Sequence, residues 1–445
     1  MLTILLCKIA AFFGKLLGRG SSLPGSIALK LNKRILGRLK MPGIVVAVTG
    51  SNGKTSTAEL IRTAAEAAGK RVVCNTEGSN QIEGVATTLL KNCGLNKKVK
   101  ADVAVLECDE RFCQHIFKYF SPTHIVVTNL FCDQMTRNGN SAFVAGELKK
   151  GLPEDSVLII NADDPVSAAL AFSRGNAVYF SVEAAQLHED ENTVHACDDG
   201  GFCPVCGARM TYGWRLQNHL GSYNCPSCGF GRKKPAHAVT SEDNGEFVLD
   251  GGIKIKPQMP NMFFAYNIAA AYTVALEVFG MRPEAAAGAL TGHTLSNDFI
   301  NRVMKFTIGR HSGTFLLSKH ENIISYNGSI RTILDADSDN ITVVIIVDLL
   351  SRKYVANDMS WLWDIDFELL RDRKIKKIVV GGRFANDVAA RLLFAGIEDE
   401  KTDVFISLDD MMPHLAGNAS GDIYLLTCFT DIGKFKSGLK GGMAQ

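Results

Sequence analysis

The sequence predicts an α/β protein with parallel sheets, because runs that read as buried strands alternate with helical stretches. Such alternation is typical of a parallel sheet that helices cover on both faces. The alternation restarts late in the chain, which predicts a second, smaller α/β domain. The predicted strands span residues 44–49, 102–106, 124–128, 156–160, 341–347, 375–380 and 422–427, and the predicted helices span 57–68, 266–279 and 387–394.

The length of 445 residues predicts two or three domains at roughly 150 residues each. We assign residues 1–40 to an N-terminal helical segment, 41–305 to a central domain and 306–445 to the C-terminal α/β domain. Residues from about 181 to 255 interrupt the alternation with Gly, Cys, Asp and Asn, and we interpret them as an insertion. The cysteine-bearing ribbon within it is placed at about residues 195–235.

The composition is that of a soluble globular protein, with 46% hydrophobic and 21% charged residues. The formal net charge of +2 predicts no global field that would recruit nucleic acid or an acidic membrane. The twelve cysteines are scattered through apolar runs, apart from two C-x-x-C pairs, and this distribution fits a reducing compartment. We therefore expect a cytoplasmic protein that does not bind nucleic acid.

The N-terminal segment from Met1 to Leu17 is apolar, and its only charged residues are Lys8 and Lys15. It lacks a convincing cleavage site for a signal peptide and is short for a membrane span. Two interpretations stay open: a helix that packs on the body of the protein, and a helix that lies on the inner face of the membrane.

A glycine-rich turn follows the first predicted strand and reads Thr-Gly-Ser-Asn-Gly-Lys-Thr-Ser-Thr over residues 49–57. Its glycines let backbone N–H groups approach phosphate oxygens, and the helix that follows adds a favourable dipole. Lys54 supplies a positive charge to the terminal phosphates, and Thr55 is a ligand for Mg²⁺. The turn departs from a full Walker A motif, since Val48 occupies the first glycine position. The residues that we expect to bind ATP here are Gly50, Ser51, Asn52, Gly53, Lys54, Thr55 and Ser56.

This turn resembles the ATP loop of Mur ligases and folylpolyglutamate synthetases. The resemblance implies that ATP phosphorylates a carboxylate and that an amine then displaces the phosphate. An acidic cluster at residues 107–110 follows the strand predicted at 102–106, and resembles the metal-binding segment of these ligases. Oxygen ligands suit Mg²⁺, so we take Glu107 as the first choice of carboxylate and Glu110 as the second. Segments 128–134 and 161–165 also match the superfamily, as turn and cap residues.

Four cysteines form two C-x-x-C-G knuckles, Cys203 with Cys206 and Cys225 with Cys228, separated by 18 residues. This spacing is typical of a zinc ribbon, in which a glycine after the second cysteine permits the turn that directs both thiolates at one ion. Four protein ligands leave no open position for water, so the predicted Zn²⁺ is structural.

A Mur-ligase core that carries a four-cysteine ribbon resembles the MurT family, the synthetase subunits of bacterial lipid II isoglutaminyl synthase. Segments 219–230, 358–367 and 381–387 also resemble this family. The resemblance implies that the chain amidates the D-glutamate α-carboxylate of the lipid II stem peptide at the inner membrane face. It also implies a heterodimer with a GatD-like class I glutaminase subunit, which supplies the ammonia.

The resemblance implies further site residues. Asp358, just ahead of a Trp-containing segment, is the best candidate for the aspartate that completes the glutaminase's Cys–His–Asp triad. Asp348 is the alternative for this role, and helix capping is the alternative role for Asp358. Asn267 and Arg302 are the nucleotide-contacting positions that remain in two stretches where the chain departs from the family pattern.

Two other functions compete with this interpretation. The first is a stand-alone ligase that joins an amino acid to a carboxylate, which would turn over without a glutaminase. The second is a non-catalytic scaffold that keeps ATP or zinc binding.

Overall fold

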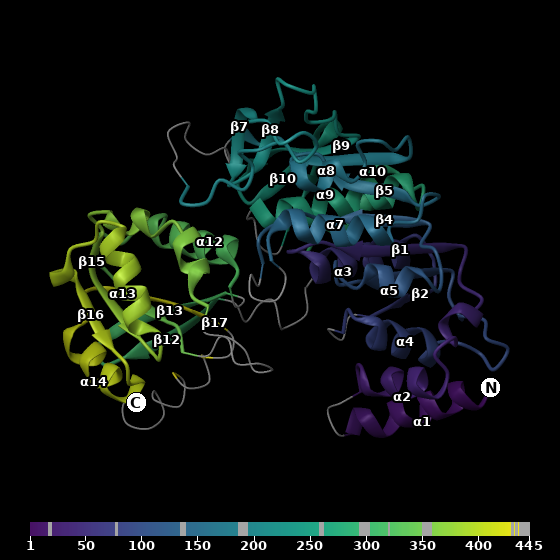
Figure 1. The fold of residues 1–445 in the computed structure, drawn as a ribbon, viewed down its shortest axis with the longest axis horizontal. Helices are drawn as coiled ribbons and strands as arrows, with labels where there is room; N and C mark the ends of the chain where they lie inside the picture. The colour runs from purple at the N-terminus through teal and green to yellow at the C-terminus, as the bar shows by residue number, and fades with distance from the viewer. Residues whose placement is uncertain are drawn as a thin grey trace. The chain divides into compact units, whose positions relative to one another are not determined.

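The computed structural model contains two compact units (Figure 1). The first unit comprises Met1–Phe131, Asn140–Thr193 and Asp199–Leu295, and the second comprises Cys132–Gly139, Val194–Asp198 and Ser296–Gln445. The structure describes residues 1–16, 20–75, 79–133, 139–185, 195–257, 262–292, 303–318, 321–348, 358–428, 431 and 435.

Within the described residues, the first unit is built on a sheet of nine strands. Their order is β11 (Ile253–Ile255), β10 (Glu246–Leu249), β9 (His237–Asp243), β6 (Ala177–Val182), β5 (Val157–Asn161), β4 (His124–Val127), β1 (Ile44–Thr49), β3 (Val103–Glu107) and β2 (Val72–Cys74). The strands from β9 to β2 pair in parallel, whereas β10 pairs antiparallel with both β9 and β11. The predicted parallel sheet is therefore confirmed.

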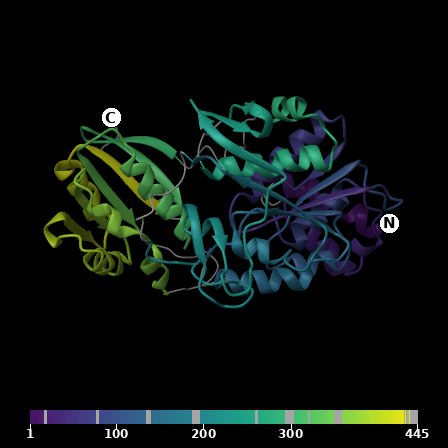
Figure 2. The ribbon, with the colours of Figure 1, turned by 90° about the horizontal axis from the view of Figure 1, so that it is seen from above.

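Helices pack against this sheet (Figures 1 and 2). They are α3 (Lys54–Ala67), α4 (Ile82–Lys91), α5 (Cys113–Phe117), α7 (Ser141–Gly151), α8 (Pro165–Ala169), α9 (Met262–Glu277) and α10 (Pro283–Leu290), with the short helix η3 (Asp250–Gly252). Helices α3 and α9 pack against each other, and the alanine-rich α9 is buried over most of its length. Residues 50–53 form the glycine-rich loop that is expected to bind phosphate and is called the phosphate loop below. Helix α3 begins at Lys54, directly after this loop, because Gly53 takes a left-handed conformation at its N-cap.

The N-terminal segment forms α1 (Leu2–Leu16), α2 (Leu23–Leu31) and the short helix η1 (Leu36–Arg38). Helix α1 packs on α2 and α4, with Ile4 and Cys7 fully buried. The interpretation that this segment packs on the body is therefore confirmed. None of the helices described has the length and apolar character that crossing a membrane would require.

The interruption predicted at residues 181–255 is only partly an insertion. Strands β7 (Thr211–Gln217) and β8 (Leu220–Asn224) form a separate antiparallel hairpin that lies among the four cysteines in sequence. Strands β9, β10 and β11 instead extend the central sheet, so the prediction was wrong for residues 237–255. The Gly- and Asp-rich composition there comes from the turn at Asn244–Gly245 and from η3, which join short strands.

Within the described residues, the second unit has a sheet of six strands, of which only β12 and β13 pair antiparallel. Their order is β12 (Val303–Ile308), β13 (His311–Ser318), β17 (Asp422–Cys428), β14 (Ile341–Ile346), β15 (Ile375–Gly381) and β16 (Thr402–Phe405). The helices are α12 (Ile323–Leu334), α13 (Ala385–Phe394), α14 (Leu408–Asn418), η4 (Ser360–Asp364), η5 (Phe367–Arg371) and η6 (Asp399–Lys401).

Strand β14 shows why this sheet is covered on both faces. All six of its residues are buried, and alternate ones enter different clusters. Val343 and Ile345 join the cluster that contains α12 and α13, whereas Val344 and Ile346 join the cluster that contains α14. A parallel strand that lies between two helical layers has this continuous apolar pattern.

Candidate active site

The phosphate loop joins the end of β1 to the start of α3. At two of its positions, steric constraints require glycine. Gly50 has φ +129°, and a Cβ there would lie 2.3 Å from Thr128 Oγ1. Gly53 has φ +83°, and a Cβ there would lie 2.3 Å from Asn267 Oδ1. Any other residue at either position would be strained and would displace a neighbour that holds the loop.

The segment after β4 holds the phosphate loop from one side. Asn52 donates its backbone N–H to Asn129 Oδ1 at 2.9 Å, and Thr128 Oγ1 donates to Asn52 O at 2.6 Å. Ser51 is fixed twice, since its hydroxyl donates to Phe131 O at 3.0 Å and accepts from Phe131 N at 3.0 Å. The described part of segment 128–134 therefore shapes the loop, a role that its assignment to turn and cap residues did not include.

Asn267 holds the loop from the other side. It lies on α9, is buried, and its Oδ1 accepts a hydrogen bond from Thr57 Oγ1 at 3.2 Å. This contact places Asn267 beside the phosphate loop through a bond to helix α3, and its predicted contact with the nucleotide stays a prediction. Arg302, the other nucleotide-contacting candidate, lies outside the described residues.

Two carboxylates from the end of β3 meet the first turn of α3. Glu107 Oε2 accepts a hydrogen bond from Thr55 Oγ1 at 2.8 Å. Glu110 Oε2 lies 3.1 Å from Lys54 Nζ, in an ion pair whose side chains are 4% and 11% exposed. Lys54 Nζ also donates to the carbonyl oxygens of Gly50 and Ser51. The structure thus brings together the predicted lysine, threonine and both predicted carboxylates.

The Glu107 carboxylate is oriented by two asparagines that sequence reasoning missed. Asn80 Nδ2 donates to Glu107 Oε1 at 3.1 Å, so each carboxylate oxygen has a partner. Asn75 clamps the Glu107 backbone, accepting its N–H at 2.7 Å and donating to its carbonyl at 2.9 Å. Both residues lie in the connection after β2, whose pairing with β3 no local sequence signal reveals.

The donor set fits Mg²⁺ at this place. The Thr55 hydroxyl and the Glu107 and Glu110 carboxylates are oxygen donors, which this cation prefers. Both carboxylates are about 95% buried, at 5% and 3% exposed, beside the single positive charge of Lys54. A divalent cation at these oxygens would offset the remaining negative charge, because buried charges need nearby charges of opposite sign.

The four cysteines form one cluster. Their Sγ atoms all lie within 4.8 Å of one another, and the Cys203–Cys228 and Cys206–Cys225 pairs are 3.7 and 3.5 Å apart. Tetrahedral Zn–S bonds of about 2.3 Å require sulfur atoms about 3.8 Å apart, so the cluster fits one Zn²⁺. All twelve cysteines of the chain lie in the described part, and none of them forms a disulfide.

The segment that carries these cysteines and the β7–β8 hairpin is attached to the sheet through buried charges. Arg232, just after the last cysteine, donates to Asp163 Oδ1 at 2.7 Å, and Tyr266 donates to Asp163 Oδ2 at 2.8 Å. Burial raises the pKa of Asp163 to about 6, although Arg232 beside it acts to lower it. Asp164 caps α8 at Val166 N and accepts from Leu130 N at 2.7 Å. The prediction that segment 161–165 supplies turn and cap residues is thus confirmed.

The tip of the β7–β8 hairpin reaches the support of the phosphate loop. His219 is fully buried, and its ring centroid lies 4.5 Å from that of Phe131. Its Nε2 lies 3.2 Å from Asp164 Oδ1, within ion-pair distance but outside hydrogen-bond geometry. Since Phe131 holds Ser51, the β7–β8 hairpin packs directly behind the loop. Sequence reasoning missed this contact, which joins residues far apart in the chain.

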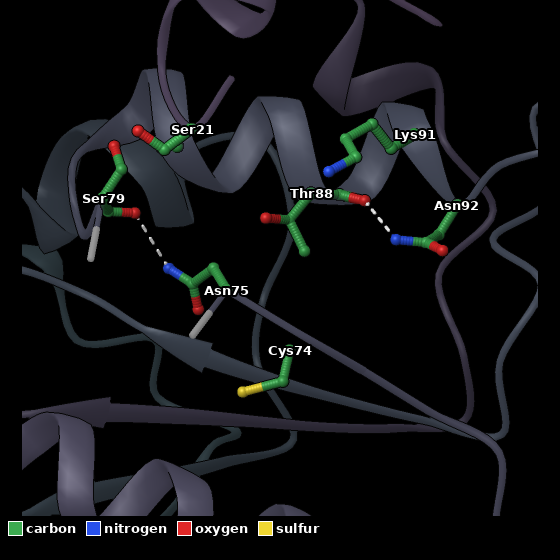
Figure 3. A pocket seen from close by; sticks show the side chains of 8 residues that line it. Ser21, Cys74, Asn75, Ser79, Thr88, Lys91 and Asn92 are labelled. Carbon is green, nitrogen blue, oxygen red and sulfur yellow. Dashed lines mark hydrogen bonds between the residues drawn. The ribbon is translucent and has the colours of Figure 1, made fainter. Parts of the chain in front are cut away.

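A small polar pocket of about 70 Å³ lies between the connection before α2, strand β2 and helix α4 (Figure 3). Its lining residues are Ser21, Cys74, Asn75, Ser79, Gly84, Thr88, Lys91 and Asn92. Asn75, which clamps Glu107, donates to Ser79 O at 3.0 Å across it. None of the lining residues belongs to the phosphate loop, so this pocket is a feature separate from the loop.

In the second unit, Asp358 is exposed, and its Oδ1 accepts the backbone N–H of Ser360 at 2.9 Å. This hydrogen bond lowers the pKa of Asp358 and contacts the first residue of η4, whose N-cap position is Met359. Asp348 follows β14, accepts Arg383 N–H at 2.9 Å and donates its own N–H to Asp431 Oδ2 at 3.1 Å. Both candidate aspartates therefore make local contacts, and only Asp358 is largely exposed.

Comparison with known proteins identifies relatives along nearly the whole chain. The Mur ligase middle domain family matches residues 48–275, and the MurT ligase C-terminal family matches residues 320–432. The MurT subunit of lipid II isoglutaminyl synthase (glutamine-hydrolyzing) from Streptococcus pneumoniae (strain ATCC BAA-255 / R6) is 30% identical over 436 residues, covering 94% of this chain and 92% of the relative. The subunit of the same name from Staphylococcus aureus (strain COL) is 29% identical over 401 residues, covering 88% and 87%.

Solved structures share the fold. A pseudomurein peptide ligase type C from Methanothermus fervidus aligns with a TM-score of 0.65 and 19% identity, covering 91% of this chain and 80% of that one. MurF ligase from Thermotoga maritima, solved in complex with ADP, aligns with a TM-score of 0.58 and 15% identity, covering 94% and 84%. The resemblance noted in the sequence is therefore confirmed: the chain belongs to the MurT family of Mur ligases, which are ATP-dependent enzymes that form carbon–nitrogen bonds.

Proposed function

We propose that the chain is the synthetase subunit of a lipid II isoglutaminyl synthase. Its substrate is the α-carboxylate of D-glutamate in the lipid II stem peptide. A carboxylate oxygen attacks the γ-phosphorus of ATP, and ADP leaves. Ammonia then attacks the acyl phosphate, inorganic phosphate leaves with that carboxylate oxygen, and a proton passes to solvent. Both MurT relatives are subunits of lipid II isoglutaminyl synthase, which supports this assignment.

The observation that carries the proposal is the meeting of Lys54 and Thr55 with Glu110 and Glu107 at one glycine loop. The N-terminus of α3 offers backbone N–H groups and a favourable dipole to phosphates, and the Lys54 ammonium adds a full charge. Thr55, Glu107 and Glu110 would hold Mg²⁺, which when bound neutralises charge on the phosphates. The ADP complex of the Thermotoga maritima relative supports nucleotide binding by this fold.

Amide formation from the acyl phosphate needs ammonia. We propose that a GatD-like class I glutaminase, in a heterodimer with this chain, supplies it. Asp358 is proposed as the third member of that partner's triad, where its carboxylate would accept the imidazole N–H and stabilise the imidazolium. Its exposure leaves it accessible to a partner chain, and the Ser360 hydrogen bond, by lowering its pKa, keeps it ionised. Asp348 is the weaker choice, since its side chain is less exposed than that of Asp358.

We further propose that the four-cysteine cluster holds one Zn²⁺ in a structural ribbon. The cluster geometry and the buried attachment through Arg232 and His219 support this role. The site of action would be the cytoplasmic face of the membrane, where lipid II carries its stem peptide.

The assignment is tested by Lys54→Ala in the complex with its glutaminase, assayed with lipid II, ATP and ammonium. Loss of the ammonium charge should reduce ATP turnover and amidation by roughly a hundredfold or more, because it removes stabilisation of developing phosphate charge. Arg62→Ala is the matched control, since Arg62 is also a cation on α3 but pairs with Glu66 at 2.8 Å on the surface. Normal amidation by the Lys54 variant would refute the assignment. ATP turnover that instead joins an amino acid to a carboxylate would support the stand-alone ligase.

A further inference from the structure

Helix α1 is apolar on two opposite faces. One face packs against α2 and α4 through Ile4, Cys7 and Ala11, which are at most 7% exposed. The other face points away from them, and its side chains are between 45% and 69% exposed. These side chains, which we call the N-terminal apolar face, are Leu2, Leu5, Ile9, Phe12 and Phe13. A surface helix normally carries polar residues opposite its packed stripe, so this exposed face requires a separate explanation.

The position of α1 makes the face available. Helices α1 and α2 lie together beyond α4 in the first unit (Figure 1). Helix α2 also exposes Leu23 and Leu31, at 42% and 57%. Large apolar side chains gathered on one element of a soluble domain mark a site of interaction with another protein or a membrane.

The charge of the N-terminal 40 residues distinguishes between a protein and a membrane as the partner. Residues 1–40 contain eight basic residues and no Asp or Glu, a net charge of +8. The remaining 405 residues carry 40 basic and 46 acidic side chains, a net charge of −6. The overall value of +2 therefore conceals a strongly basic N-terminal segment. Its basic residues are Lys8, Lys15, Arg19, Lys30, Lys33, Arg34, Arg38 and Lys40.

We propose that the N-terminal apolar face is a membrane-binding surface whose partner is a bilayer containing anionic lipids. Phenylalanine and leucine side chains enter the boundary between headgroups and acyl chains, while lysine and arginine attract the anionic headgroups. Because the opposite face of α1 is packed on the body, the helix lies in the plane of the membrane. A second copy of the chain is a poor partner for this face, since it would bring another +8 segment against the first.

This inference rests on the proposed function only for the choice of leaflet, the one at which lipid II presents its stem peptide to the enzyme. Binding to lipid vesicles requires neither ATP nor an acceptor. The test therefore uses full-length protein and vesicles of phosphatidylcholine, with or without phosphatidylglycerol, and without lipid II. Failure to bind would leave the ligase activity intact, and loss of ligase activity would leave vesicle binding intact, so the two proposals fail separately.

Flotation of the protein with vesicles should show binding that increases with the fraction of phosphatidylglycerol and weakens with added salt. Phe12→Ser with Phe13→Ser should reduce the partition coefficient at least about tenfold, because two aromatic rings no longer enter the interface. Leu393→Ser with Ile406→Ser is the matched control. These residues are 61% and 64% exposed in the second unit, and their replacement should leave binding unchanged.

The electrostatic part is tested by Lys33→Glu with Arg34→Glu, compared with Lys233→Glu with Lys234→Glu elsewhere in the first unit. All four residues are exposed. The first pair should weaken the preference for phosphatidylglycerol, and the second should leave it unchanged. Equal binding to neutral and anionic vesicles, or no binding to either, would overturn the proposal. So would an oligomer in light scattering that the Phe12 and Phe13 replacements dissociate, because a second copy would then cover the face.

Discussion

The Thr55 hydroxyl donates to Glu107 Oε2 at 2.8 Å, which joins the first turn of α3 to the carboxyl end of β3. Parallel pairing of β1 with β3 brings these two positions to the same edge of the sheet. Ligand sites of open α/β sheets lie at this edge. The contact therefore supports the proposal that a nucleotide and its metal ion bind at this edge.

Glu107→Gln should raise the Mg²⁺ concentration needed for half-maximal ATP turnover by at least about tenfold, because a neutral amide is a weaker ligand for a hard cation. The measurement is ATP turnover titrated with Mg²⁺ in the complex with the glutaminase. Asp102→Asn is the control, since Asp102 precedes the same strand but pairs with Arg71 on the surface at 2.8 Å. An unchanged Mg²⁺ requirement in the Glu107 variant would remove this residue from the metal site.

Cys203→Ser should lower the Tm by roughly 5 °C or more, because structural zinc contributes directly to folding free energy. Elemental analysis should find one zinc per chain in the wild type and less in this variant. The folded fraction should keep most of its activity, since the ribbon carries no reacting group. Cys197→Ser, outside the cluster, should retain both the zinc and the Tm. Wild-type protein without metal, and with four reactive thiols at these positions, would contradict the prediction.

Asp163 should make stability depend on pH in a defined window. Burial raises its folded pKa to about 6 from the usual 3.8, so the protonated form favours folding. This contribution is complete below pH 3.8 and is lost as the pH rises through 6. Asp163→Asn lacks the titration, so its free energy of unfolding relative to the wild type should rise by about 1 kcal/mol between pH 5 and pH 7.

Chemical denaturation of the wild type and the Asp163 variant at pH 5, 6 and 7 measures this difference. Removal of the carboxylate that pairs with Arg232 shifts the free energy of unfolding of the variant by a constant amount. The prediction therefore concerns only how the difference between variant and wild type changes with pH. A difference that is flat across the window would show that Asp163 titrates in the ordinary carboxyl range.

The local signals in the sequence predicted the phosphate loop, Glu107, Glu110 and the cysteine cluster. Each of these depends on spacing within a short stretch, which the fold preserves. The roles of Asn80 and His219 could not be predicted, because they arise from contacts between distant parts of the chain. Asn80 contacts Glu107, 27 residues away, and the His219 ring contacts the ring of Phe131.

The extent of the insertion was predicted wrongly for a related reason. Strands β9 to β11 are short and separated by Gly-containing turns, so their composition resembles that of the ribbon before them. Their place in the sheet depends on parallel pairing of β9 with β6, and this pairing has no local signature. Overall net charge likewise hid the basic N-terminal segment, because a sum discards position along the chain.

Asp358→Asn should separate glutamine hydrolysis from the amidation that uses ammonia. Glutamine-driven amidation by the complex should fall by at least about a hundredfold, because an amide cannot stabilise the imidazolium of the partner's histidine. Amidation from added ammonium should persist, since the phosphate loop is unchanged. If Asp358 only caps η4, the variant should lose roughly 1 kcal/mol of stability and keep its glutaminase activity. Equal loss in both assays would instead place Asp358 in the synthetase site.

Asp348→Asn provides the comparison for that experiment. Asp348 accepts a backbone N–H from Arg383, a bond that an asparagine side-chain oxygen also accepts. Its replacement should leave the ratio of glutamine-driven to ammonium-driven amidation unchanged. A selective loss of the glutamine-driven reaction in this variant would transfer the triad role from Asp358 to Asp348.

Transfer of a labelled oxygen tests the central claim most directly. Lipid II with ¹⁸O in the D-glutamate α-carboxylate is incubated with the complex, ATP, Mg²⁺ and glutamine, and the inorganic phosphate is analysed by mass spectrometry. Activation as an acyl phosphate predicts one ¹⁸O in each phosphate released, in step with amide formation, and Lys54→Ala should abolish both. Amide formation with unlabelled phosphate, or ATP hydrolysis without amide, would contradict the account.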